Sequence, residues 1–390
     1  PGDYQAFQHF ITSAPWSADA LWQGLRDQMP VREGVLIFDG TSFPKQGRHS
    51  VGVARQYCGA LGKLANCQVA VTAALWTGTH AWLLGAQLYL PESWTTPAAR
   101  AQARIPRTVP FREKWRQALT LFHQPRAAGV QPTAVLADAE FGDNSTFRRV
   151  LHRAKLSYAV GISSTQSVFV GTPGLTRLPA ATGRPPRRPT VPPGVAPATV
   201  AALVATWPRT AWHRITWRNA PGARRCGGRF AAQRVAPAHD WRQRALAPEI
   251  WLLAEQIPSG PPRTKYYFVH RPPTASLRAL VQLTHQRWAI EQQYQELKDE
   301  LGLDHFEGRS WPGWHRHDHA PASPCRRSGP SFRKSSPRTS SSRDPTICTA
   351  CCSYSRSHCG SDKVVLSDGG ATTLQYLGNA VRWLCADDPP

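Results

Sequence analysis

The chain has 390 residues, and its 47 Lys and Arg against 25 Asp and Glu give a formal net charge of +22. This length can bury a sizeable core and predicts two domains, while the charge favours a polyanionic partner. Ribosomal, RNA-binding and membrane-surface proteins are also basic, so the charge selects only a class of partner. No apolar run is long enough to span a membrane, no secretory signal is visible, and the nine cysteines follow no disulfide pattern. We therefore expect a cytoplasmic protein.

Two apolar runs, at 34–39 and 133–138, share one design. The first ends in Asp39 and a turn, and the second ends in Asp138. Both are typical of buried strands whose carboxyl ends present an aspartate, at the edge where α/β sheets place their chemistry. A single aspartate after a strand is more often a turn former or a helix cap, but two of them favour a shared site.

The elements around these runs also follow from the sequence. Apolar runs at 69–76 and 82–90 surround Thr77-Gly78-Thr79-His80, which predicts a hairpin. We expect helices at 111–123 and 144–155, and a further strand at 158–162. Inserted strands are expected at 210–218, 228–235, 250–255 and 266–270.

A later helical segment carries the third acidic residue of interest. Arg287, Glu291 and Lys298 stand at positions i, i+4 and i+11, within roughly 40° of one another on a helix wheel. A carboxylate between two cations, at the edge of a buried face, suits metal-assisted work on a phosphodiester. A solvated helix face with ordinary ion pairs is the alternative. The adjoining apolar stripe, which we expect to be buried, consists of Ile290, Tyr294, Leu297 and Leu301.

These segments resemble the DDE transposases of bacterial insertion sequences, in the branch with a Tyr-x2-Arg-x3-Glu-x6-Lys signature. Arg287, Glu291 and Lys298 fit this spacing, but Thr284 stands at the Tyr position. The resemblance covers roughly residues 3–317. It implies an α/β fold with a ribonuclease H-like mixed sheet flanked by helices and a β-rich insertion before the last catalytic helix. Other segments similar to the family are 39–41, 50–57, 88–94, 111–115, 137–142 and 301–309.

The resemblance implies strand cleavage and strand transfer of an insertion sequence. Three carboxylates without His or Cys suit Mg²⁺, with Mn²⁺ as the other option, and two ions about 4 Å apart would stabilise the attacking and leaving oxygens. We therefore expect Asp39, Asp138 and Glu291 to be the catalytic metal ligands.

The expected partner is double-stranded DNA, both the transposon ends and the target, in the bacterial nucleoid. Arg287 and Lys298 are expected to hold DNA phosphates, and Lys45 and Arg48 of the polar loop at 44–49 are expected to contact further phosphates. Each of the loop cations also suits an ordinary solvated surface charge. A homodimer on DNA is left open, and no membrane is expected.

The expected organisation has four parts. A helical segment covers 1–32 and begins at Pro1 rather than Met, which suggests a missing amino-terminal part. The catalytic domain covers 33–163 and 266–317, and the β-rich insertion with its Pro/Arg-rich connector covers 164–265. The tail, 318–390, has a composition typical of disorder, and we attribute it to a reading-frame change near residue 318.

Three alternatives accompany this interpretation. Cysteines and a histidine between 348 and 359 have zinc-like spacing, but no framing strands or helix accompany them, so we favour a disordered tail. A catalytically decayed transposase would act only as a basic nucleic-acid-binding protein. A ribonuclease H-like nuclease of repair or RNA processing would share the site but not the family segments. A need for metal distinguishes the decayed form from an active enzyme.

Overall fold

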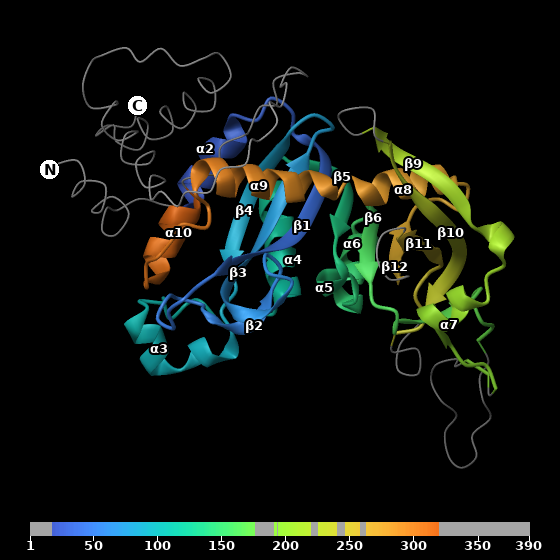
Figure 1. Ribbon diagram of the computed structural model, residues 1–390, viewed down its shortest axis with the longest axis horizontal. Coiled ribbons are helices and arrows are strands. Elements are labelled where there is room, and N and C mark those ends of the chain that lie inside the picture. The colour runs from blue at the N-terminus through green and yellow to red at the C-terminus, as the bar shows by residue number, and fades with distance from the viewer. Residues whose placement is uncertain are drawn as a thin grey trace, which may run out of the picture.

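A computed structural model of the protein describes residues 18–175, 191–192, 194–219, 225–239, 246–257 and 263–319. Within these residues, one 12-stranded sheet forms the centre of the molecule and helices flank it (Figure 1). Most neighbouring strands are antiparallel, and only β1–β5 and β5–β6 are parallel among the described strands. The expected ribonuclease H-like mixed α/β fold agrees with this sheet.

The first half of the chain forms the part of the sheet that contains the two aspartates. Its strands are β1 (Glu33–Pro44), β2 (Ala54–Cys58), β3 (Lys63–Trp76), β4 (Ala81–Leu88), β5 (Gln131–Ala137) and β6 (Ser157–Ile162). The hairpin expected around Thr77-Gly78-Thr79-His80 is confirmed, because β3 pairs antiparallel with β4 on either side of it. The strand expected at 34–39 was predicted too short, because β1 continues to Pro44 in register with β3. The turn expected directly after Asp39 is therefore wrong.

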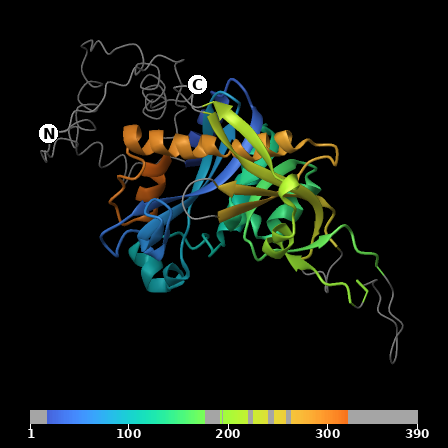
Figure 2. The ribbon, with the colours of Figure 1, turned by 45° about the vertical axis from the view of Figure 1, so that its right-hand side comes forward.

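Helices cover both faces of the sheet. The α-helices are α2 (Ala18–Asp27), α3 (Pro97–Gln102), α4 (Lys114–Ala127), α5 (Ala139–Gly142), α6 (Ser145–Arg153), α7 (Val200–Ala205), α8 (Leu277–His285), α9 (Trp288–Leu301) and α10 (Trp311–His319), and short 3₁₀ helices are η1 (Glu92–Thr95) and η2 (Arg209–Ala211). In both views the orange α8 and α9 lie end to end across the strands (Figures 1 and 2). Every helix in the described part of the chain is too short or too polar to cross a membrane.

The inserted strands extend the central sheet. They are β7 (Ser167–Val170), β8 (Ala198–Thr199), β9 (His213–Asn219), β10 (Arg225–Pro237), β11 (Ile250–Ile257) and β12 (Arg263–His270). The four strands predicted here are confirmed, with shifted ends. Strand β12 pairs antiparallel with β6, from Tyr158↔His270 to Ile162↔Tyr266, and so crosses the boundary expected at 265/266. The described residues do not include the segment 1–17, most of the Pro/Arg-rich connector, or the tail from residue 320 with its cysteines.

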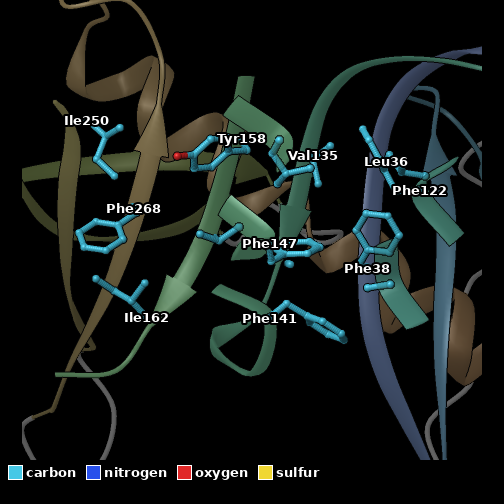
Figure 3. Packing of buried hydrophobic residues seen from close by; sticks show 14 of the residues in the cluster. Leu36, Phe38, Phe122, Val135, Phe141, Phe147, Tyr158, Ile162, Ile250 and Phe268 are labelled. Atoms are coloured by element: carbon cyan, nitrogen blue, oxygen red, sulfur yellow. The ribbon is translucent and has the colours of Figure 1, made fainter. Parts of the chain in front are cut away.

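Alternating side chains of the central strands build two hydrophobic cores. Leu36 and Phe38 of β1 pack on the face covered by α4, α5 and α6, whereas Ile37 packs on the face covered by α8 and α9. Figure 3 shows Phe38 beside Phe141 and Phe147, and the rings of Phe38 and Phe147 meet edge to face with centroids 5.9 Å apart. This packing fixes the strand ends from which the candidate site is built.

Candidate active site

The register of two parallel strands brings Asp39 and Asp138 together. Their last paired residues are Ile37 of β1 and Leu136 of β5, and each aspartate lies two residues further along. Neighbouring strands lie about 4.8 Å apart, so the two aspartates lie side by side, Asp39 within β1 and Asp138 directly after β5. Ile37 and Leu136 both pack under α8 and α9, and alternation along the strand turns the aspartates to the same face.

Helix α9 adds Glu291 on that face. Arg287, directly before the helix, places Nη1 3.1 Å from Oδ2 of Asp39 and Nη2 2.5 Å from Oε1 of Glu291. The guanidinium therefore bridges strand β1 and helix α9. The side chain of Asp39 is 11% exposed and that of Glu291 is 51% exposed, so Glu291 lies at the open side of the group.

Buried contacts fix α9 against the strands beside Asp39. The Tyr294 hydroxyl is hydrogen-bonded to Oγ1 of Thr72. The Thr72 hydroxyl in turn donates to the backbone carbonyl of Asp39 at 3.4 Å. Gln293 Nε2 donates to the carbonyl of Ala81 at 3.0 Å. The buried stripe is confirmed for Ile290, Tyr294 and Leu297, and the side chain of Leu301 lies outside the described residues. The Tyr294–Thr72 contact was not predicted, since it depends on which strand lies under the helix.

Burial and mutual repulsion perturb the acidic residues. Burial raises the pKa of Asp39 to about 7, with Arg287 opposing the shift and Asp138 and Glu291 adding to it. The pKa of Asp138 is also raised, first by burial, while Arg287 again opposes the shift. Burial tends to lower the pKa of Arg287, but the carboxylates around it raise that pKa overall. The carboxylates of Asp39, Asp138 and Glu291 therefore interact electrostatically around one guanidinium.

Sequence comparison decides the family. Residues 1–223, more than half of the chain, match the profile of the family described as DDE superfamily endonuclease. The chain belongs to the DDE superfamily endonucleases. The matched region contains Asp39 and Asp138 and ends before Glu291, so the third carboxylate rests on the helix pattern and on the geometry above.

A named relative agrees with this family. The chain is 32% identical over 172 residues to "Probable transposase for insertion sequence element IS701" of Microchaete diplosiphon. The match covers 43% of this chain and 42% of that protein, so the chain spans less than half the length of the relative. Endonucleases of the DDE superfamily use divalent metal ions.

Asp138 also acts as a helix cap in this DDE superfamily endonuclease. Its Oδ1 accepts a hydrogen bond from the backbone N–H of Glu140 at 3.0 Å, so it also caps α5, which was the alternative interpretation of this residue. Glu140 is a further acidic residue that the sequence analysis missed. It raises the pKa of Asp138 and forms an ion pair with Lys114 at 2.6 Å. Its position two residues after Asp138 was the available signal.

The expected phosphate-binding cations lie in different environments. Lys298 Nζ donates to the carbonyl of Ser42 at 3.3 Å, and burial lowers its pKa. Arg48 is exposed. Lys45 has a side chain only 2% exposed, and its ammonium donates to the carbonyls of Asp304 and Phe306 and pairs with Glu307. This burial does not fit the expected phosphate contact of Lys45, which instead joins β1 to the segment after α9.

The donor types of the site fit a hard divalent cation. Carboxylate oxygens are the ligands that Mg²⁺ and Mn²⁺ prefer. Burial, with the charges of Asp138 and Glu291, raises the pKa of Asp39 although Arg287 opposes the shift, and a bound cation would favour the charged form of this carboxyl group. Among the described residues, no three His, Cys, Asp or Glu side chains are arranged to hold one metal ion. Arg287 explains why the acidic side chains are not arranged around one ion, because its guanidinium occupies oxygens of both Asp39 and Glu291.

Proposed function

We propose that this DDE superfamily endonuclease is a transposase that cleaves DNA strands and transfers a freed 3′ hydroxyl to a second strand. The observation that supports this most strongly is that Arg287 forms ion pairs with Asp39 and Glu291 and interacts electrostatically with Asp138. The printed name of the IS701 relative supports the same function. The net charge of +22 suits double-stranded DNA as the substrate.

In this proposal Asp39, Asp138 and Glu291 are the metal ligands. Two Mg²⁺ or Mn²⁺ ions, when bound, would stabilise the attacking and leaving oxygens of an in-line displacement at phosphorus. Asp39 must lose the proton that its raised pKa favours before it can act as a ligand. Glu291, the most exposed of the three interacting carboxylates, would then close the site.

Arg287 would exchange partners when DNA binds. A planar guanidinium can bind a phosphate in place of carboxylates, so a DNA phosphate beside α9 competes with Asp39 and Glu291 for Arg287. Its release would free the oxygens of Asp39 and Glu291 that it occupies. Lys298, in the last turn of α9, would bind a second phosphate once its hydrogen bond to the carbonyl of Ser42 is broken. Substrate binding and completion of the metal site are thereby linked.

The test compares two substitutions on one helix. Glu291→Gln should abolish Mg²⁺-dependent nicking of a supercoiled plasmid, while DNA binding without metal stays close to that of the parent protein. Glu296→Gln makes the same chemical change on α9, where Glu296 accepts a hydrogen bond from Gln292, and should leave nicking intact. Nicking by Glu291→Gln would refute the assignment of Glu291.

The same assay separates the decayed alternative. A protein that binds plasmid DNA but nicks it with neither Mg²⁺ nor Mn²⁺ would be a basic nucleic-acid-binding remnant of a transposase. Metal-dependent nicking that Asp39→Asn and Asp138→Asn both abolish would exclude that alternative.

A further inference from the structure

A cavity of about 370 Å³ lies between helix α6 and the inserted strands, away from the acidic residues. Its cationic side is formed by Arg148, Arg149 and Arg153 of α6, with His152 and His239 close by. Its apolar side includes Tyr158 of β6 and Ile250 of β11. Among the described residues, no carboxylate lines this cavity, so its electrostatic character favours an anion.

The cavity is distinct from the candidate active site. Tyr158 and Ile250 belong to the core on the α6 face of the sheet and are both drawn in Figure 3. Glu291 is on α9, whose buried residue Ile290 belongs to the core on the opposite face. A phosphate held at Arg287 therefore cannot also occupy this cavity.

Arg148 is the buried cation of the cavity. It is 5% exposed, its Nη1 donates to the carbonyl of Gly142, and its guanidinium lies 5.2 Å from the ring centre of Phe268. Among the described residues, no carboxylate forms an ion pair with it, and the nearby Asp143 accepts from the backbone N–H of Ser163. A buried cation without a paired anion is costly, and an anionic ligand would offset that cost.

The apolar part of the lining suits a flat, largely apolar group. Tyr158 is 3% exposed and its ring stacks on His270, with centroids 5.2 Å apart. Its hydroxyl bonds to no other described residue, and burial raises its pKa to about 12, so it remains a donor at neutral pH. The accessible apolar residues of the lining are Leu246, Ala247 and Pro248, and a nucleobase can lie against them.

We propose that this cavity binds a single nucleotide unit, with its phosphate on the arginines of α6 and its base against Leu246, Ala247 and Pro248. The unit is either a free nucleotide or one unpaired nucleotide of a longer strand. The size of the cavity is in the range of small-ligand pockets, and its lining combines cationic side chains for a phosphate with apolar side chains for a base. Strand cleavage plays no part in this proposal.

The test uses two variants that alter the cavity in different ways. Arg149→Gln removes a cation and leaves the buried Arg148 in place. Ala247→Trp fills the cavity and leaves its charge unchanged, with Ala247→Leu as the milder variant should the first fail to fold. Arg126→Gln, at an exposed position of α4 outside the cavity lining, is the charge-matched control.

Binding of fluorescent 5′-phosphorylated decathymidylate is measured without divalent cations, and thymidine monophosphate and inorganic phosphate are used as competitors. Both cavity variants should weaken binding about tenfold relative to the control, because Ala247→Trp displaces the base and Arg149→Gln removes one charged contact to the phosphate. Arg149→Gln should also reduce the salt slope by about 0.7. Competition by the mononucleotide would identify a free nucleotide as the ligand, and binding of the decamer alone would identify a strand.

Two results would overturn the proposal. One is unchanged binding in the folded Ala247→Trp or Ala247→Leu protein. The other is displacement of the probe by inorganic phosphate as efficiently as by the mononucleotide, which would leave only an anion site. The binding assay contains no divalent cation and measures no strand cleavage, so failure of the transposase assignment would leave its result unaffected.

Discussion

Replacing Gly142 by Ala should destabilise the protein strongly, because α5 touches β6 through bare backbone at this residue. A Cβ at Gly142 would lie 1.9 Å from the carbonyl oxygen of Gly161 and 2.9 Å from Cβ of Val160. Side-chain carbons do not approach other atoms closer than 3.0 Å, so one backbone must move by at least 1.1 Å (3.0 − 1.9). Gly161 is held in β6 by its pairing with Tyr267, so the movement disturbs the sheet.

The expected loss is about 3 kcal/mol in the free energy of unfolding, the upper part of the usual range for overpacking, because the closest clash is with the backbone carbonyl of Gly161, which cannot rotate away as a side chain can. Urea unfolding followed by tryptophan fluorescence measures it. Gly24→Ala is the matched control, since a Cβ there meets no heavy atom within 4 Å and α2 should gain about 0.5–1 kcal/mol from it. A Gly142→Ala protein within about 0.5 kcal/mol of the parent would refute the reasoning.

Three further predictions test the site and its supports. Lys45→Met should lower the free energy of unfolding by about 1–3 kcal/mol, because the carbonyls of the 304–307 segment lose a buried donor, whereas the exposed Arg48→Met should change it by under about 0.5 kcal/mol. The pKa of Asp39 rises from 3.8 to about 7 on folding, so the folded state keeps a proton that the unfolded chain releases. The stability of the metal-free protein should therefore fall as pH rises from about 4 to about 7 and then level off. Urea midpoints should depend less on pH across this range in Asp39→Asn, with a residual dependence from Asp138, whose pKa is also raised, and an unchanged slope would contradict the assignment. Arg287→Gln should bind Mn²⁺ more tightly than the parent without DNA, by calorimetry, and yet nick DNA more slowly. Weaker metal binding would show that Arg287 does not compete for the carboxylates.

Local patterns in the sequence predicted the parts of the site that depend on one segment. The two apolar runs identified β1 and β5, and their aspartates lie in neighbouring positions of the parallel register. The spacing of Ile290, Tyr294 and Leu297 predicted the buried side of α9. These features follow from periodicity alone, because the position of a residue along a helix or strand decides on which face its side chain lies.

Features that depend on a distant partner were not predictable in this way. Strand β1 runs beyond Asp39 because β3 continues to pair with it. Lys45 is buried because a segment about 260 residues later folds over it, and its sequence neighbourhood resembles an ordinary polar loop. The guanidinium of Arg287 faces carboxylates from β1 and α9 together, which the helix pattern could not show.

The place of Glu291 does not depend on the length of chain between it and Asp138. These residues are 153 positions apart (291 − 138), yet the insertion between them ends in β12, which lies directly beside β6. Helices α8 and α9 then span residues 277–301, about 37 Å at 1.5 Å per residue. That length is close to the seven strand spacings from β10 to β4, about 34 Å at 4.8 Å each. Helix α8 contacts β9, β10, β12 and β6, and α9 contacts β1, β3 and β4. The first turn of α9, with Glu291, therefore reaches β1 whatever the insertion contains, as long as β12 pairs with β6.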